Sequence, residues 1–203
     1  MSEWSDKALS FSYCETEILS WILRLYTNNA PFDADATYSA GRMWRGLPQP
    51  KIKFDLCPQS PDVIEADSRD LPLPNESINS LMFDPPFVMK NTTTRTPNGI
   101  IESRFTGYGS ASKLWTMYGD SLHEFYRVLR PGGIVAFKCQ DVVSSGRNHW
   151  SHIEVYTMAM ACGFVAKDLF VLGRKSVMWS PNMRNQKHAR KNHCYYWVFE
   201  KKG

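Results

Sequence analysis

Four consecutive residues, Asp84-Pro85-Pro86-Phe87, are the part of the sequence whose types and order most clearly suggest chemistry. The two prolines fix φ and remove two backbone donors, and the residue before a proline is held extended. We therefore expect a rigid corner that offers only hydrogen-bond acceptors, the Asp84 carboxylate and nearby carbonyl groups. Acceptors beside an aromatic ring suit a planar group that carries an NH2, as a nucleobase does. A tight Asp-Pro turn with Phe87 in the core is the alternative.

This corner has to be positioned by the strand that precedes it. Residues 78–83 form a short piece without charges that includes Leu81 and Met82, as in a strand buried on both faces of a parallel sheet. In an open α/β sheet, ligands bind at the carboxyl ends of the strands, which is where Asp84 would stand. Two further strands are predicted at 51–56 and 62–66, and residues 32–41 are predicted to be part strand and part turn.

The second half of the chain alternates helices and strands. Apolar residues at helical spacing predict a helix over 114–129, which Pro131-Gly132-Gly133 ends. At the N-terminus, Ser12-x-x-Glu15 resembles a capping box and predicts a helix over about 12–29. The remaining elements are a strand at 133–139, a helix from 151, and strands at 164–172 and 194–200. This order predicts an α/β fold with a mostly parallel sheet, whose last two strands can pair antiparallel because no helix separates them.

Two segments show neither a helical nor a strand period. Residues 88–113 form a long loop rich in Thr, Ser and Gly, and residues 173–193 form a basic loop. Long loops in compact domains are usually functional or mobile. No linker or repeat divides the chain, so we expect one domain over 1–203, with a catalytic core over about 30–203.

Charge is unevenly distributed along the chain. The net charge is +4, from 24 Lys and Arg against 20 Asp and Glu. Residues 174–203 hold eight basic residues and one acid, a net charge of +7, which leaves −3 on the rest. This pattern is common in proteins that meet a polyanion, although a charge run can also be a solvated face. The candidate phosphate contacts are Lys90, Arg95, Arg104, Arg184, Lys187, Arg190 and Lys191.

Several features exclude other classes of protein. The five Cys are scattered and include no C-x-x-C pair, which favours a reducing cytoplasm over a disulfide framework. The five His show no metal-ligand spacing, so we expect no metal site. The N-terminus lacks the pattern of a signal peptide, and no apolar run approaches the roughly 20 residues of a membrane span. We expect no membrane partner, and the sequence leaves a monomer or a homodimer open.

The Asp-Pro-Pro-Phe corner at the end of a fourth strand resembles motif IV of class I S-adenosylmethionine-dependent amino-methyltransferases, which act on adenine N6 or cytosine N4. Residues 126–133, Tyr-Arg-Val-Leu-Arg-Pro-Gly-Gly, with the apolar run 134–137, resemble the helix, turn and fifth strand of that family. The chain looks like the small DNA methylases of bacteria and phages, over roughly residues 30–200. The resemblance implies a Rossmann-like class I methyltransferase fold, with a mostly parallel seven-stranded sheet whose last strand is antiparallel.

The resemblance also implies a site for S-adenosylmethionine. Asp55 stands where the family places an acid on the ribose hydroxyls, and Asp67 where an acid meets the adenine. The family's Gly-rich loop after the first strand is missing. The nearest substitute is the segment 35–41, in which Gly41 would permit close backbone approach, although an ordinary turn is the alternative. The implied cofactor contacts are Thr37, Tyr38, Ser39, Gly41, Asp55, Asp67 and Asp84.

The implied reaction is direct methyl transfer to an amine. Asp84 and the Pro85 carbonyl would accept hydrogen bonds from the NH2 group, Pro86 would keep the corner rigid, and Phe87 would stack on a base that has left its duplex. Gln140 is a candidate contact to that base, with a strand-end turn as the alternative. Adenine N6 in DNA is favoured. The alternatives are an RNA adenine or cytosine N4 methylase, or a catalytically silent nucleic-acid-binding module on the same fold.

Overall fold

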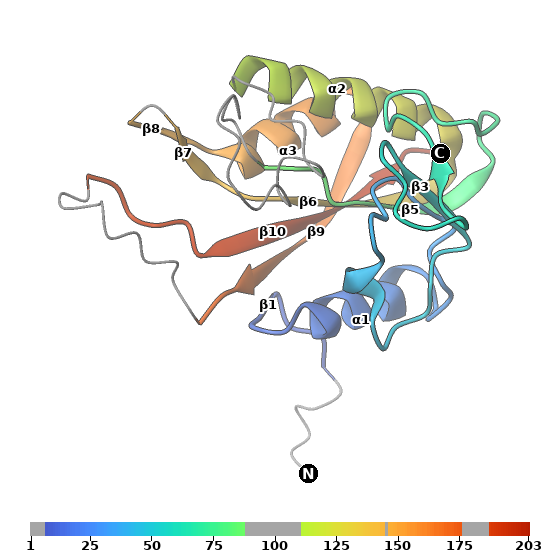
Figure 1. Ribbon diagram of the computed structural model, residues 1–203, viewed down its shortest axis with the longest axis horizontal. Helices are drawn as coiled ribbons and strands as arrows, with labels where there is room; N and C mark the ends of the chain where they lie inside the picture. Colours follow the sequence, from blue (N-terminus) through green and yellow to red (C-terminus); the bar gives the residue numbers. More distant parts are fainter. Residues whose placement is uncertain (1–6, 88–110, 145, 176–186) are drawn as a thin grey trace, which may run out of the picture.

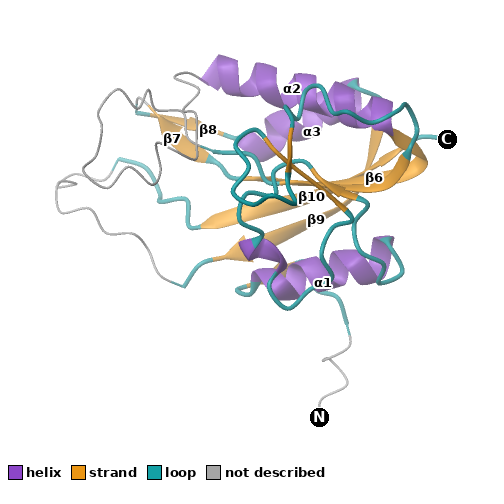
Figure 2. Cartoon of the chain, turned by 45° about the vertical axis from the view of Figure 1, so that its right-hand side comes forward, coloured by secondary structure: helices purple, strands orange, loops and turns teal. Residues whose placement is uncertain are grey.

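The computed structural model describes residues 7–87, 111–144, 146–175 and 187–203. Within these ranges the chain is layered around one central sheet, with α2 and α3 on one face and α1 on the other (Figures 1 and 2). The helices are α1 (Glu15–Tyr26), α2 (Ala111–Val128) and α3 (Ser151–Ala161), with a short 3-10 helix, η1 (Arg42–Trp44).

In the described part of the chain, the main sheet has eight strands in the order β1-β9-β10-β6-β5-β2-β3-β4. All neighbours are parallel except for β10, which runs antiparallel to both β9 and β6. The strand bounds are β1 (Phe11–Ser12), β2 (Ala34–Asp35), β3 (Ile52–Asp55), β4 (Ile64–Glu65), β5 (Ile78–Phe83), β6 (Leu129–Cys139), β9 (Phe164–Gly173) and β10 (His193–Lys201). A separate hairpin pairs β7 (Val142–Ser144) with β8 (Arg147–His149).

The strand order reverses between β2 and β5. From β2 the chain continues outward to β3 and β4, whereas β5 leads to β6 on the other side. Such a reversal leaves a crevice at the carboxyl ends of the two strands, where ligands of open α/β sheets bind. These ends lie on one side of the sheet, which is the side of the β7–β8 hairpin in Figure 1, and the C-terminus lies on the other side.

Two apolar layers hold the sheet in place. On the side of α2 and α3, the rings of Phe125 and Phe137 each contact Phe83 edge to face, with ring centroids 4.9 Å apart. On the other side, α1 buries Ile18 and Ile22 against the sheet. Because β5 and β6 are covered on both faces, the buried parts Leu81–Phe83 and Ile134–Phe137 are continuous apolar runs. Lys138 in β6 is a charged exception.

The sequence prediction for the N-terminus was partly wrong. The helix predicted over 12–29 extends only over Glu15–Tyr26, and Cys14 stands at its N-cap position. Ser12 instead lies in β1, opposite Leu172, where its Oγ accepts a hydrogen bond from the Cys14 N–H (2.9 Å) and donates one to Glu17 (2.5 Å). The added strand β1 makes the sheet eight-stranded within the described residues, where the sequence predicted seven.

The fold class itself is confirmed, with a mostly parallel sheet and an antiparallel last strand. The strand predicted at 78–83 has these bounds in the structure, and the strands predicted at 62–66 and 51–56 are shorter. Residues 111–113, predicted as the end of the long loop, belong to α2. The rest of that loop, 88–110, lies outside the described residues. No helix in the described ranges is long and apolar enough to span a membrane.

Candidate functional site

A cavity of about 300 Å³ opens at the carboxyl ends of β2, β3 and β5, next to the reversal of strand order. Its walls combine acidic side chains with apolar ones such as Phe83 and Met117. Six of the seven predicted cofactor contacts line it, namely Thr37, Tyr38, Ser39, Asp55, Asp67 and Asp84. The fold therefore brings together residues that lie up to 47 positions apart in the sequence.

The loop after β2 is shaped by Asp35, which is 2% exposed. Its carboxylate accepts hydrogen bonds from Trp44 Nε1 (2.7 Å) and from the Thr37 N–H (2.8 Å). The loop thus folds back onto the end of its own strand and leads directly into η1. A short acid-centred turn stands where the resembled family has its Gly-rich loop.

Burial raises the pKa of Asp35 to about 7, because the hydrogen bonds from Trp44 and Thr37 only partly offset desolvation. The nearby carboxylates of Asp84 and Asp55 raise this pKa further. Sequence analysis missed Asp35 as a site residue. The available signal was its place as the acid that closes the first strand of the sheet.

Gly41 does not line the cavity, so its predicted role as a cofactor contact has no geometric support. Its φ is +62°, and an added Cβ would lie 2.3 Å from the Tyr38 hydroxyl oxygen. Gly41 therefore makes room for the Tyr38 side chain, which does line the cavity. The Tyr38 hydroxyl donates a hydrogen bond to Gln49 Oε1 (2.6 Å), which holds the ring in place.

Asp55 connects two of the loops around the cavity. Its Oδ2 accepts a hydrogen bond from the Ser39 N–H (2.7 Å), and its Oδ1 accepts one from the Cys57 N–H (2.8 Å). The carboxylate is thereby fixed at the end of β3 with its oxygens beside the cavity. A carboxylate oxygen has two lone pairs, so each oxygen retains capacity to accept a ligand hydroxyl.

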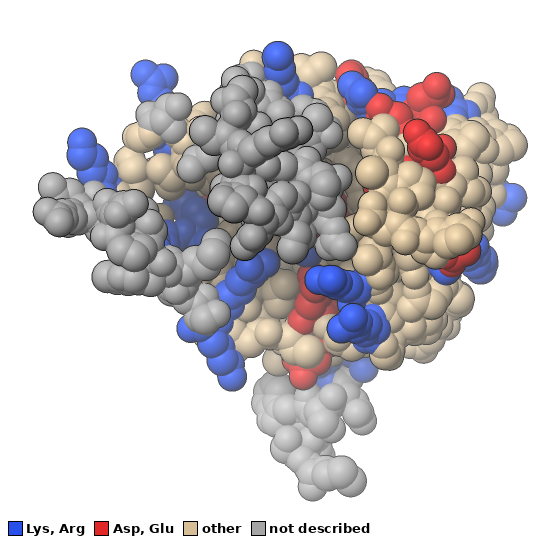
Figure 3. Space-filling model, viewed as in Figure 1, with Lys and Arg blue, Asp and Glu red and all other residues tan. Residues whose placement is uncertain are grey.

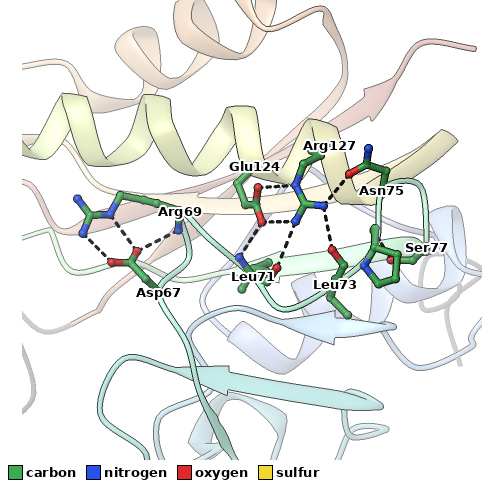
Figure 4. A network of polar contacts seen from close by, with 9 residues as sticks. Asp67, Arg69, Leu71, Leu73, Asn75, Ser77, Glu124 and Arg127 are labelled. Carbon is green, nitrogen blue, oxygen red and sulfur yellow. Dashed lines mark hydrogen bonds and ion pairs between the residues drawn. The ribbon is translucent and has the colours of Figure 1, made fainter.

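Asp67 is held by a fork-like pair with Arg69. The guanidinium donates to both carboxylate oxygens (2.9 and 2.6 Å), and this contact lowers the pKa of Asp67. The loop that follows is tied to α2, because Glu124 Oε1 accepts a hydrogen bond from the Leu71 N–H (2.7 Å) and is paired with Arg127 (2.6 Å) (Figure 4). The network shown in Figure 4 therefore anchors this wall of the cavity on a helix.

Asp84 stands at the corner between the cavity and the core of the sheet. Its backbone N–H donates to Thr37 Oγ1 (2.7 Å), which joins the end of β5 to the loop after β2. Pro85 is buried, and the Pro86 carbonyl accepts a hydrogen bond from the Tyr118 hydroxyl (3.2 Å). Both sides of the turn are thus fixed, as the proline pair predicts.

Phe87 is half-buried and packs against the core on the α1 side of the sheet. It is not among the residues that line the cavity. Stacking of Phe87 on a target base therefore stays a prediction. The residues that follow Phe87 lie outside the described ranges.

Sequence analysis missed an ion-pair cluster behind Asp84. Lys138 Nζ lies 2.9 Å from Asp84 Oδ2 and 2.7 Å from Glu15 Oε1, and the Tyr196 hydroxyl donates to that same Glu15 oxygen (2.5 Å). The Lys138 side chain is only 8% exposed. The available signal was a lysine inside the otherwise apolar strand 134–139, because a buried charge of this kind requires a partner.

The charged groups in this cluster shift one another's pKa values. Burial acts to lower the pKa of Lys138, but the carboxylates of Asp84 and Glu15 outweigh it and the pKa is raised. Burial acts to raise the pKa of Glu15, but Lys138 and the Tyr196 hydroxyl lower it below its usual value. For Asp84 burial dominates, so its pKa is raised although Lys138 opposes the shift.

The predicted phosphate contacts are only partly described. Lys187, Arg190 and Lys191 lie in the described residues, whereas Lys90, Arg95, Arg104 and Arg184 lie outside them. The Gln140 amide donates to the Lys191 carbonyl (3.0 Å), so its described contact holds the basic segment. Lys191 Nζ lies 4.4 Å from the Trp150 ring centroid. On the face shown in Figure 3, Lys and Arg side chains lie at the left and at the lower centre, and at the lower centre acidic side chains lie beside them.

No protein-family model matches the sequence, and no curated protein matches it. Among solved structures, the 1,6-didemethyltoxoflavin-N1-methyltransferase of Burkholderia thailandensis, which has S-adenosylhomocysteine bound, has a TM-score of 0.57 at 14% identity, covering 95% of this chain and 80% of that one. The cyclase SpnF has a TM-score of 0.52 at 12% identity, covering 90% and 80%. The likeness to the Burkholderia enzyme shows the class I methyltransferase fold.

A third structure is a protein of Thermus thermophilus that is provisionally named a DNA modification methylase. It has a TM-score of 0.45 at 18% identity, and the match covers 68% of this chain and 51% of that one. The chain thus spans about half the length of that protein. Since SpnF is named as a cyclase, a function for this chain has to be argued from its own site.

Proposed function

We propose that the protein is an S-adenosylmethionine-dependent methyltransferase that acts on the exocyclic amine of a nucleobase, with adenine N6 in DNA as the favoured target. The observation that carries the proposal is the position of the Asp84-Pro85-Pro86 corner. It lies at the carboxyl end of β5 and lines the cavity that the cofactor would occupy. The methyltransferase fold and the bound S-adenosylhomocysteine of the Burkholderia enzyme support the choice of cofactor.

The residues of the cavity fit this cofactor chemically. Asp55, at the end of β3, would accept the ribose hydroxyls, and Asp67 would face the adenine. The buried Asp35 places a further carboxylate in the cavity wall, where it suits a cationic group. Apolar walls from Phe83 and Met117 suit the flat adenine ring and the carbon atoms attached to the sulfonium sulfur. When bound, S-adenosylmethionine supplies an electrophilic methyl group.

Asp84 would orient the target amine. Lys138 Nζ donates a hydrogen bond to Asp84 Oδ2, and within the described residues Oδ1 accepts no hydrogen bond. Oδ1 and the Pro85 carbonyl can therefore accept the two N–H groups of the amine and favour a tetrahedral nitrogen as the new bond forms. Holding this nitrogen near the methyl group contributes through proximity. The nitrogen becomes cationic, and therefore acidic, as the methyl group bonds to it, so Asp84 need not be a strong base to accept the proton that it releases.

Cofactor binding and methyl transfer test the proposal separately. We expect calorimetry to show binding of S-adenosylmethionine, and we expect tritiated methyl groups to pass to unmethylated DNA, with N6-methyladenine as the product base. Transfer to RNA, or to cytosine N4, would show that the target is not adenine N6 in DNA and would replace it by the base and nucleic acid that are methylated. Binding without transfer to DNA, RNA or nucleosides would contradict it and favour a silent nucleic-acid-binding module.

Cofactor affinity should depend on pH through Asp35. With a pKa of about 7, Asp35 is about half protonated at neutral pH, and a cationic ligand favours its ionised form. Binding should therefore release a proton near pH 6, and affinity should rise towards pH 8, by at most about tenfold per pH unit. Calorimetry in two buffers with different ionisation enthalpies measures the released proton.

An Asp35→Asn variant is the control for this prediction. It keeps the size of the side chain but cannot ionise, so the part of the proton release that belongs to Asp35 should disappear. The ammonium of the cofactor titrates equally with both proteins and cancels in the comparison. Equal proton release by the two proteins would contradict the role given to Asp35.

A further inference from the structure

A second cavity, of about 830 Å³, opens at the same ends of the parallel strands as the first cavity, between β1, the start of α1 and the end of β9. Glu15 and Lys138 are among the residues that line it. Because Lys138 Nζ lies 2.9 Å from Asp84 Oδ2, and Asp84 lines the first cavity, the two cavities meet at one ion pair. A ligand in the second cavity would thus lie next to Lys138, the partner of Asp84, on the other side of this ion pair from the cofactor.

Two aromatic rings form a platform at the mouth of this cavity. Phe11 and Tyr13 are 45% and 57% exposed, and their rings meet edge to face with centroids 4.9 Å apart. Both rings lie against the backbone of Gly173, where an added Cβ would come within 2.9 Å of each. The close packing on a glycine at the end of β9 holds the platform in position before any ligand arrives.

Basic side chains stand beside the platform, and of the two acids that line the cavity Glu17 is exposed whereas Glu15 is half-buried. Arg174 and Lys175 are exposed and line the cavity, and Lys175 Nζ lies 5.3 Å from the centroid of the Tyr13 ring. Glu15 lies further in and is held by Lys138. The cavity therefore offers a flat aromatic surface, a cationic rim and a carboxylate floor.

A nucleotide has a chemical group that matches each of these three features of the cavity. Its phosphate pairs with cations, its base stacks on an exposed ring, and an exocyclic amine donates to carboxylates. Exposed aromatic rings beside basic side chains are the combination by which proteins bind single strands, because every base has a π-face.

We propose that this second cavity is the acceptor site, and that it takes a nucleotide of single-stranded nucleic acid with its base on Tyr13 and its phosphate at Arg174 and Lys175. The inference rests on the proposed function, and it adds where the substrate strand lies. It also gives β1, a strand that sequence analysis did not anticipate, a role in substrate binding.

The test uses the full chain and a fluorescein-labelled DNA single strand of about 12 nucleotides that contains adenine. Fluorescence anisotropy measures strand binding, calorimetry measures S-adenosylmethionine binding, and tritium transfer to the same strand measures activity. Tyr13→Ala should weaken strand binding about tenfold, whereas Tyr13→Phe keeps the ring and should bind as the wild type does. Joint replacement of Arg174 and Lys175 by alanine should flatten the salt slope by about 0.7 for each lost phosphate contact.

Two exposed residues away from the cavity serve as matched controls. Lys202 follows β10 at the opposite edge of the sheet, and Tyr156 is 41% exposed on α3. Alanine at either position should leave strand binding unchanged. None of the variants should alter S-adenosylmethionine affinity, since none of these residues lines the first cavity.

The outcomes separate the two proposals. The acceptor site is overturned if Tyr13→Ala and the double alanine variant of Arg174 and Lys175 bind the strand with the affinity and salt slope of the wild type. It is also overturned if the wild type binds no strand. If the variants bind as the wild type does and the wild type transfers methyl groups, the acceptor site is overturned but the proposed function stands. If the wild type binds the strand and the variants lose binding, but no protein transfers methyl groups, the site is supported and the proposed function fails.

Discussion

An Asp84→Ala variant should lose methyl transfer by about 10³-fold while it still binds S-adenosylmethionine. The loss follows because Asp84 Oδ1 would no longer accept the target amine, and single groups that act on developing charge or carry out proton transfer contribute about 10²–10⁴-fold. Cofactor binding should persist because the Asp84 backbone N–H, rather than its side chain, makes the hydrogen bond to Thr37 Oγ1. Tritium transfer and calorimetry measure the two effects.

Asp62→Ala is the matched control for this variant. Asp62 is also an aspartate paired with a lysine, because its Oδ2 lies 2.6 Å from Lys53 Nζ, but it is exposed and lies outside both cavities. Its removal should leave methyl transfer unchanged. Full activity of Asp84→Ala, or loss of cofactor binding that equals its loss of transfer, would show that Asp84 does not orient the acceptor amine.

The core of the fold could be predicted because its signals are local. The strand at 78–83 and the helix that ends before Pro131 are encoded by neighbouring residues, and the structure has both. The antiparallel last strand followed from the lack of a helix between the strands at 164–172 and 194–200. Asp84 was placed at the cavity by the rule that ligands of open α/β sheets bind at the carboxyl ends of the strands, whereas the positions of Asp55 and Asp67 were implied by the family resemblance; all three line the cavity.

The parts that sequence analysis missed depend on contacts between distant residues. Ser12 and Glu15 match a capping box, but Ser12 lies in β1 and pairs with Leu172 of β9, and this pairing overrides the local preference. Similarly, nothing near Lys138 in the sequence indicates that Glu15, 123 positions earlier, supplies its second carboxylate. Local patterns therefore located the Asp84-Pro85-Pro86 corner, whereas the ion pairs that support it came only from the folded chain.

Replacement of Lys138 by methionine should destabilise the protein and also reduce methyl transfer. The substitution keeps an unbranched side chain of similar length but leaves the carboxylates of Glu15 and Asp84 without their shared cation. Removal of one partner from a fully buried ion pair costs about 3–5 kcal/mol of unfolding free energy, and we expect a smaller cost here because the side chains of Glu15 and Asp84 are 34% and 27% exposed. Transfer should fall further than the loss of folded protein explains, because Asp84 Oδ2 would lose the contact that orients its carboxylate.

The destabilisation by Lys138→Met should grow as pH rises. In the wild type, the pKa of Glu15 is lowered, so the stability it contributes is present above its usual pKa of 4.5 and is lost as pH falls through the folded value. In the variant, burial without the ammonium raises the pKa of both Glu15 and Asp84, so the folded state retains protons that the unfolded chain has released. Its stability then falls from pH 4.5 towards pH 7.5, and urea unfolding at these two pH values measures the difference.

Lys201→Met separates the loss of a buried lysine from a loss at the site. Lys201 has an equally buried side chain, 8% exposed, and is paired with Glu76 (3.0 Å), but it ends β10 at the opposite edge of the sheet. Both variants should be less stable, and only Lys138→Met should lose transfer per folded molecule. If Lys201→Met loses transfer equally, or if Lys138→Met keeps wild-type transfer per folded molecule, Lys138 has only a structural role, and the cation between the two cavities does not orient Asp84 for the reaction.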